Sequence, residues 1–139
     1  MKHVVNLIYR WPLWMAAVGV LLAGCGAGAD QGSQAGAASA VEAYLQARVE
    51  KKVEQMALLS CPEWEAQARL EAVSFQSMDA SLEGVICQAN GTQGANTLVD
   101  CEGKIITTYQ GEVREWSVAE HPYVVVRQDG EWRMCGYAQ

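Results

Sequence analysis

The sequence is poor in basic residues, and those that it has do not cluster. It contains 10 Lys and Arg against 16 Asp and Glu, which gives a formal net charge of −6. Proteins that bind nucleic acids or anionic lipid headgroups through charge need clustered Lys and Arg, because their ligands carry phosphate groups. We therefore expect no nucleic-acid partner and no basic membrane-binding patch.

Residues that ligate metals or transfer protons are also scarce. Histidine occurs twice, at His3 and His121, and no two cysteines are spaced as CxxC. Structural zinc sites usually take closely spaced pairs of Cys or His, and His121 stands alone before Pro122 with no residue spaced to form a catalytic relay. We expect no metal, no cofactor and no catalytic role for His121. Two pairs of carboxylates are expected to be solvated surface groups: Asp79 with Glu83, and Asp100 with Glu102.

The longest apolar run, from Trp11 to Leu22, is too short to span a membrane comfortably, because a spanning helix needs about 20 apolar residues. Basic residues precede it, which is the order of an export signal. The run leads into Leu22-Ala23-Gly24-Cys25, which matches the lipobox of bacterial lipoproteins. We therefore expect residues 1–24 to be a signal peptide and Cys25 to carry a lipid that anchors the exported protein in a membrane of the cell envelope.

A stretch of small residues follows the lipobox. Residues 25–38 are mainly Gly, Ala, Ser and Gln with one charge, which predicts a flexible tether. A single folded domain is expected to cover residues 39–139. A capping box formed by Ser39 and Glu42 predicts that the first helix begins there, and amphipathic spacing extends this helix to about Ser60.

A second helix is expected to open at Pro62, because proline suits the first helical position. Its apolar stripe consists of Trp64, Ala68, Ala72 and Phe75. From Met78 onward the apolar residues alternate and β-branched residues accumulate, which indicates strands. The strands are expected at residues 82–88, 97–109, 113–118, 123–128 and 131–137.

Pairs of turn residues mark the reversals between these strands. Asp129-Gly130 predicts a two-residue type I′ hairpin, because both positions of that turn need positive φ. Asn90-Gly91 and Gln110-Gly111 are expected to mark the other reversals. The fold class is therefore α+β: two N-terminal helices packed on a curved antiparallel sheet of four to five strands that run as a meander, in a cone or roll. In the closing hairpin we expect Trp132 to face the helices, with a local bend near Cys135.

The chain from Ser39 to Tyr137 resembles a known superfamily. A capped helix VEAYLQARVEKKVEQM, a second helix opening at CPEW and a sheet ending in the hairpin DGEWRMCGY are similar to the nuclear transport factor two-like domains, the cystatin-like cone of a long helix wrapped by a bent sheet. More narrowly, the chain resembles small bacterial lipoproteins with that domain. The resemblance implies a fold that serves enzymes and binding modules alike, and no site residue of the enzymes maps onto a position here.

Four cysteines follow Cys25, and export places them in an oxidising compartment, which favours two disulfide bonds. Three pairings are open. The expected strands favour Cys87 with Cys101, which flank one hairpin, and therefore Cys61 with Cys135. A bond from Cys101 to Cys135 is disfavoured, because a strand would separate them and the Cα atoms of a disulfide must lie within about 7 Å.

The function expected first is that of a non-catalytic envelope lipoprotein whose domain binds a protein partner or assists assembly. A carrier of a small apolar ligand is the alternative, and an isomerase- or dehydratase-like enzyme comes third. A cavity of about 300 Å³ or more with a buried carboxylate or histidine would favour the ligand or enzyme hypotheses. The aromatic side chains that could line such a pocket, or fill the core, are Trp64, Phe75, Tyr109, Trp116 and Trp132.

Overall fold

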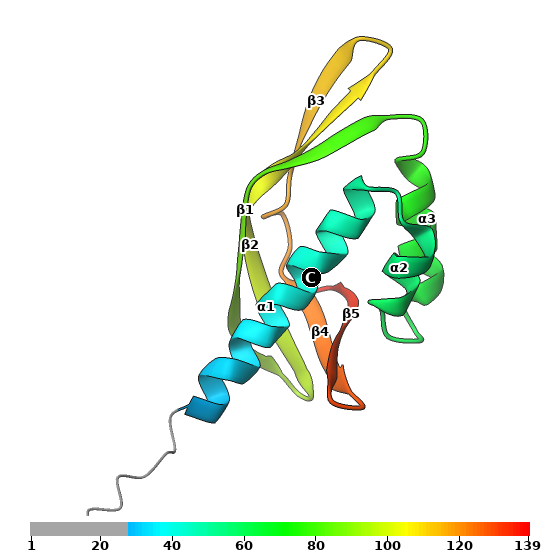
Figure 1. Cartoon of the computed structure of the whole chain (residues 1–139). Coiled ribbons are helices and arrows are strands. Elements are labelled where there is room, and N and C mark those ends of the chain that lie inside the picture. The colour runs from blue at the N-terminus through cyan, green and yellow to red at the C-terminus, as the bar shows by residue number, and fades with distance from the viewer. Residues whose placement is uncertain (1–27) are drawn as a thin grey trace, which may run out of the picture.

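The computed structural model describes residues 28–139, with side chains from Gly32 onward, and has the expected α+β class (Figure 1). The predicted signal peptide, the lipobox and Cys25 lie outside the described residues. Helix α1 lies across a five-stranded antiparallel sheet, and α2 and α3 lie beside it. The elements are α1 (Gly28–Val49), α2 (Val53–Leu58), α3 (Glu65–Ser74), β1 (Asp79–Gln93), β2 (Asn96–Tyr109), β3 (Glu112–Ser117), β4 (Tyr123–Gln128) and β5 (Glu131–Tyr137).

Helix α1 starts earlier than the capping box predicts. It begins at Gly28, so residues 28–38 belong to the helix, and Ala37 and Ala38 are buried in the core. Alanine has the highest helix propensity, and its small side chain lets a helix approach the sheet closely. The predictions of a flexible tether over these residues and of a helix start at Ser39 were therefore wrong, because Ser39 lies in the interior of α1.

The chain reverses after α1, where one continuous helix was expected. Helix α1 ends at Val49, and Lys51 has a φ of 62°, which breaks the helical backbone. The reversal lets α2 pack back onto the core, where Met56 is fully buried. The prediction of a single helix as far as Ser60 was therefore wrong, because the amphipathic spacing is the same on both sides of the break.

The corner between α2 and α3 is joined to the last strand by backbone hydrogen bonds. Cys61 donates from its backbone N–H to Met134 O, and Met134 donates to Leu59 O, each at 2.8 Å. Helix α3 then begins at Glu65 instead of Pro62, because residues 62–64 form a turn. The predicted apolar stripe of α3 is buried at Ala68, Ala72 and Phe75.

The long strand β2 is the centre of the sheet. It pairs along one edge with β1, and along the other edge with β4 at residues 97–99 and with β3 at residues 104–109. Strand β5 pairs with β4 and completes the order β1-β2-β4-β5. The sheet therefore branches, which corrects the simple meander expected from the sequence. A strand of 14 residues is long enough to hold two partners end to end along one edge.

Two glycines on neighbouring strands let the sheet bend. Gly84 in β1 and Gly103 in β2 have φ values of 62° and 103°, and the register shifts between Glu83 and Ile86. A Cβ at Gly103 would lie 2.6 Å from the carbonyl oxygen of Gly84, so a side chain does not fit there. Beyond this bend, residues 104–117 of β2 and β3 form an arm that projects past α1 (Figure 1).

Two of the three predicted turns are confirmed. Both residues of Asp129-Gly130 have positive φ, at 51° and 83°, and both residues of Gln110-Gly111 do as well, at 50° and 85°. Asn90-Gly91 does not reverse the chain. It lies inside β1 at a register shift between Ala89 and Thr92, and the chain reverses near Gly94 instead. An Asn-Gly pair suits a bulge as well as a turn, because glycine tolerates positive φ in both.

The closing hairpin faces the helices as predicted. Met134 is fully buried, and Trp132 packs against the core from the same face of β5. The predicted local bend is also present: Val124 pairs with Gly136 and Val125 with Met134, so Cys135 is an extra residue in the ladder. The bulge turns the residues after it toward the helices, which brings Tyr137 to the core.

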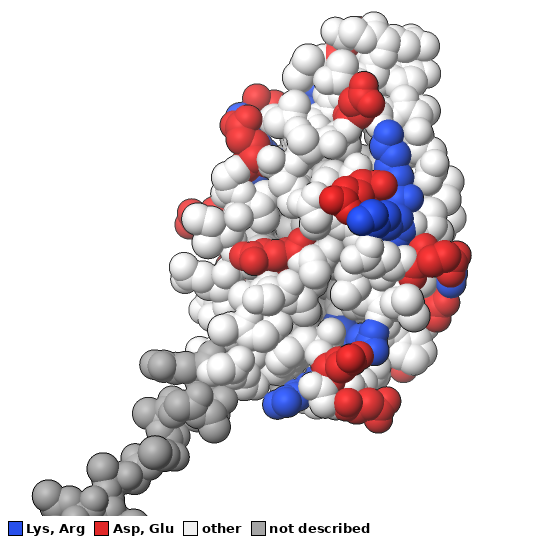
Figure 2. All heavy atoms as spheres, viewed as in Figure 1, with Lys and Arg blue, Asp and Glu red and all other residues white. Residues whose placement is uncertain are grey.

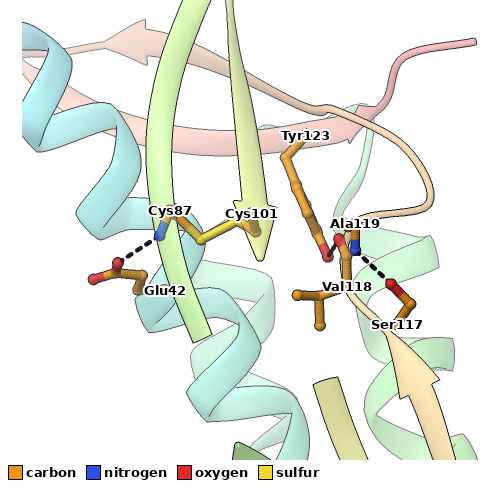
Figure 3. Close-up of a disulfide and its surroundings, with 7 residues drawn as sticks. All are labelled: Glu42, Cys87, Cys101, Ser117, Val118, Ala119 and Tyr123. Atoms are coloured by element: carbon orange, nitrogen blue, oxygen red, sulfur yellow. Dashed lines mark hydrogen bonds between the residues drawn. A yellow bond between two sulfur atoms is a disulfide. The ribbon is translucent and has the colours of Figure 1, made fainter. Parts of the chain in front are cut away.

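Both disulfide bonds have the favoured pairing. Cys87 and Cys101 lie directly opposite each other on β1 and β2, with their Cα atoms 4.1 Å apart, and Cys61 joins Cys135 across 5.3 Å. Figure 3 shows the first bond beside α1, where Glu42 accepts a hydrogen bond from the backbone N–H of Cys87 at 3.0 Å. Glu42 therefore joins α1 to the sheet instead of capping the helix.

Charged side chains are spread over the surface, and acidic ones predominate. On the face shown in Figure 2, red Asp and Glu side chains lie apart from one another, several of them next to a blue Lys or Arg. Within residues 28–139, no helix is both long enough and apolar enough to cross a membrane.

Candidate functional site

A hollow of about 450 Å³ lies where α1 ends, between the helices and the base of the β2–β3 arm. The apolar part of its wall consists of Phe75, Met78, Ile105, Trp116 and Val118. The residues called here the polar floor are Arg48, Glu71 and Tyr137, and the exposed rim includes Glu120 and His121. This first hollow therefore combines an apolar wall with several polar groups, and ligand pockets commonly contain both.

Glu71 is the centre of a buried hydrogen-bond network beneath the first hollow. It lies on α3 with 8% of its surface exposed. Tyr44 of α1 donates to Glu71 Oε2 at 2.9 Å, and Tyr137 of β5 donates to Oε2 and Oε1 at 3.1 and 3.2 Å. Trp64 Nε1 donates in turn to Tyr44 OH at 3.1 Å. Because a buried carboxylate needs such donors in place of water, the network holds α1, α3 and β5 together.

Arg48, in the last turn of α1, has much weaker partners than Glu71. Its Nη1 lies 3.6 Å from Glu71 Oε2 and 3.5 Å from Tyr137 OH, at or beyond the outer limit of a hydrogen bond. Its Nε is buried and has no hydrogen-bond partner in the part of the chain that the structure describes. The guanidinium lies over the Phe75 ring, 4.9 Å from its centroid. The first hollow is thus lined by a cation whose hydrogen-bonding capacity is largely unused.

The tyrosines around the floor are held in their neutral form. Burial, with a contribution from the negative charge of Glu71, raises the pKa of Tyr44 and of Tyr137 well above the ordinary value. Burial also raises the pKa of Tyr123 to about 12. Tyr123 donates its hydroxyl to the carbonyl oxygen of Val118 at 3.1 Å (Figure 3). These hydroxyls therefore act as hydrogen-bond donors within the protein.

A second hollow, of about 330 Å³, lies along the inner face of the β2–β3 arm. Met78 and Trp116 line both hollows. Trp116 is 51% exposed, and its Nε1 donates to Thr107 Oγ1 at 3.0 Å, which fixes the indole between the two. The other residues of the second hollow are Ser77, Thr107, Tyr109, Glu112 and Arg114.

The five aromatic residues singled out from the sequence have different places. Phe75 and Trp116 line the first hollow, and Tyr109 and Trp116 line the second. Trp64 belongs to the buried network instead, where its ring also meets Tyr137 edge to face at 5.5 Å between centroids. Trp132 packs against Gly36 of α1 and does not line either hollow.

The other groups weighed from the sequence lie on the surface. Asp79, Glu83, Asp100 and Glu102 are all exposed, as predicted. His121 is exposed at the rim of the first hollow. Within the described side chains, the one cluster of candidate metal ligands contains Cys61, Glu63 and Cys135, and its two cysteines are joined to each other as a disulfide.

The sequence reasoning missed the two charged residues of the polar floor, although a signal for them was present. Glu71 occupies an apolar-stripe position of α3, one residue before Ala72 and three after Ala68. Arg48 similarly follows Tyr44 by four residues on the buried face of α1. A charged residue on an otherwise buried helix face indicates a buried ionic group, because successive residues on one face lie three or four apart.

No protein-family model matches the sequence, and a search of curated protein sequences finds no match. The function proposed for this chain therefore depends on the geometry of its own residues.

Proposed function

We propose that the mature protein is a membrane-anchored extracytoplasmic lipoprotein whose domain binds a small, mostly apolar ligand. The observation that carries this proposal is the first hollow, whose 450 Å³ lie within the usual range of ligand pockets, roughly 300 to 1,000 Å³. Its apolar wall offers burial to a ligand, and its floor contains a buried carboxylate. Because of this hollow, we rank a ligand carrier ahead of the partner-binding module that the sequence favoured.

The floor supports binding more than proton transfer. Glu71 already accepts hydrogen bonds from Tyr44 and Tyr137, and a general base needs a free position near the proton that it removes. The raised pKa values of these tyrosines make them poor acids near neutral pH. A carrier needs only shape, apolar surface and a few fixed polar groups.

The anchor and the fold family belong to the same proposal. Helix α1 has 22 residues, so its last turn lies about 30 Å from its first. A lipid on Cys25 would hold the N-terminal end of α1 near the membrane and keep the first hollow at the opposite end of the helix. The long helix on a bent sheet supports a nuclear transport factor two-like domain, a fold compatible with a ligand pocket.

Binding of the uncharged fluorophore N-phenyl-1-naphthylamine tests the ligand proposal. We expect saturable fluorescence enhancement with the wild-type domain. Met78→Trp should lower the affinity for the fluorophore at least tenfold, because the larger ring fills the space where the two hollows meet. Val113→Trp is the matched control, since Val113 is 64% exposed on β3 and does not line either hollow. Equal binding by both variants would contradict the proposed site.

Intact mass of the membrane-extracted protein tests the anchor. We expect the wild-type mass to correspond to a chain beginning at Cys25 with a diacylglyceryl increment, and Cys25→Ser to lack that increment, because only a thiol forms the thioether. A mature wild-type chain without it would contradict the lipoprotein proposal.

A partner-binding module is the second candidate, and one feature favours it. Leu58 on α2, and Leu70 and Val73 one turn apart on α3, are more than half exposed, and exposed apolar side chains that form a continuous patch mark interaction surfaces. Replacing Leu70 and Val73 with Ser distinguishes the two candidates. A carrier keeps its fluorophore affinity in this variant, whereas a partner-binding module loses cross-links to its partner in the envelope.

A further inference from the structure

The guanidinium of Arg48 is a half-buried polar group of the first hollow with few hydrogen-bond partners. Arginine has five N–H donors, yet Nε has no partner among the described residues and Nη1 has only the contacts at 3.5 and 3.6 Å. Only 23% of the side chain is exposed, so water reaches little of it. Buried polar groups in proteins are normally hydrogen-bonded, so this guanidinium has room for an acceptor from water or from a ligand.

Glu71 does not supply that acceptor well. Its oxygens accept three contacts of 2.9 to 3.2 Å from the hydroxyls of Tyr44 and Tyr137, and these fix its position on the far side of the 3.6 Å gap to Arg48. A bidentate arginine–carboxylate pair has two contacts of about 2.7 to 2.9 Å. Arg48 therefore has the capacity to bind a second anionic group.

We propose that the ligand is a long-chain carboxylic acid, with its carboxylate at Arg48 and its alkyl chain running past Met78 and Trp116 into the second hollow. This inference rests on the proposed carrier function and specifies the ligand class. Arg48 is the one Lys or Arg that lines the first hollow in residues 32–139, and the carboxylates of Glu71 and Glu120 line it as well, so an anionic head has a single place to bind there.

The two hollows favour an elongated ligand over a compact one. They share Met78 and Trp116, so a chain that leaves the first hollow meets the second without crossing the core. Strand β2 lines the first hollow with Ile105 and the second with Thr107 and Tyr109, so the ligand would follow the strand for about 13 Å. The charges of the second hollow, Arg114 and Glu112, lie 3.4 Å apart and neutralise each other. An uncharged chain therefore suits this part.

Three ligands with the same chain and different heads test the proposal: dodecanoate, dodecanol and dodecylamine, each titrated below its micelle concentration by isothermal calorimetry. We expect dodecanoate to bind 10- to 100-fold more tightly than dodecanol, since hydrogen bonds to charged groups contribute more than neutral ones, and dodecylamine to bind most weakly. Equal or tighter binding of the alcohol or the amine would overturn the carboxylate assignment and leave the carrier function intact. If none of the three ligands binds and the naphthylamine probe does not bind either, both the carboxylate assignment and the carrier function would be overturned.

Variants of the floor separate recognition from folding. Arg48→Met should abolish the preference for the acid while binding of the alcohol persists, and Arg48→Lys should restore part of it. Glu71→Gln should raise dodecanoate affinity severalfold, because it removes a competing negative charge and keeps an oxygen for Tyr44. Arg69→Met is the control: it removes a charge that pairs with Glu54 and Glu65 away from both hollows. It should leave the affinities for the acid and the alcohol unchanged. Circular dichroism checks that each variant is folded. An acid preference that survives Arg48→Met in a folded protein would refute the role of Arg48.

The chain length of the acid tests the second hollow. Affinity should rise roughly fourfold for each methylene as long as the added group is buried. We expect this rise to continue from octanoate to tetradecanoate in the wild type. In Tyr109→Arg, which places a charge in the second hollow, the rise should stop at a shorter chain. The same plateau in both proteins would show that the ligand is confined to the first hollow.

Discussion

Gly36 of α1 lies directly against the indole of Trp132 in β5. A Cβ at Gly36 would come within 2.9 Å of Trp132 Cδ1 and Nε1, which is closer than real Cβ atoms approach other atoms. The contact joins the N-terminal half of α1 to the closing hairpin. It also explains why residues before Ser39 belong to the domain.

Two glycine substitutions in α1 should therefore have opposite effects. Gly36→Ala should lower the free energy of unfolding by about 1 to 3 kcal/mol, because the indole, which is partly buried against the core, must shift. Gly32→Ala should raise it by about 0.5 to 1 kcal/mol, because nothing lies within 4 Å of its added methyl group and alanine favours the helix. Urea unfolding measures both. Similar stabilisation by the two would mean that α1 does not pack on Trp132.

The buried network predicts a cost for losing one tyrosine hydroxyl. Tyr44→Phe leaves Glu71 without its 2.9 Å donor and Trp64 Nε1 without its acceptor, so it should reduce the free energy of unfolding by about 1 to 3 kcal/mol. Tyr109→Phe is the matched control, because Tyr109 is half exposed and should change stability by less than about 0.5 kcal/mol. Equal urea midpoints for the two variants would count against the network.

The two disulfide bonds should contribute unequally. Their sequence separations are 14 and 74 residues, and in the chain-entropy model a longer loop gives more stabilisation. Replacing Cys87 and Cys101 by Ala should cost about 3 kcal/mol, and replacing Cys61 and Cys135 about 4 to 5 kcal/mol. Urea unfolding under oxidising conditions compares the double variants, and non-reducing peptide mapping checks the pairing. A peptide joining Cys87 to Cys61 would contradict the strand register.

Stability should fall at high pH because of the buried tyrosines. The ordinary pKa of a tyrosine is 10.0, and burial raises that of Tyr123 to about 12 in the folded domain. The stabilisation from this group is complete below pH 10 and decreases as the pH rises to 12, by about 2 to 3 kcal/mol, because the unfolded chain releases its proton first. Tyr44 and Tyr137 act in the same direction. Urea midpoints between pH 9 and 11.5 should fall less steeply in Tyr123→Phe than in the wild type, and identical slopes would contradict this effect.

The sheet was largely predictable because its signals are local. The alternation of apolar residues, together with Asp129-Gly130 and Gln110-Gly111, identifies four of the five strands within a few residues. The start of α1 was not predictable from its capping box, because it depends on the distant contact between Gly36 and Trp132. The branching of the sheet likewise depends on how β4 and β3 share one edge of β2.

The candidate site was only partly predictable. Phe75 and Trp116 could be chosen as pocket aromatics from their residue type, but the same argument also selected Trp132, which packs on α1. The roles of Arg48 and Glu71 become visible only when α1 and α3 are placed side by side. Neither helix alone shows that the two charges meet under a hollow.

The central claim is that the domain binds its ligand in the first hollow, and amide chemical shifts test this most directly. In a ¹H–¹⁵N correlation spectrum titrated with dodecanoate, we expect the largest shifts at Phe75, Met78, Ile105 and Trp116, with smaller ones at Thr107 and Tyr109 of the second hollow. Shifts concentrated at Leu58, Leu70 and Val73, or no shifts at saturating ligand, would contradict the account.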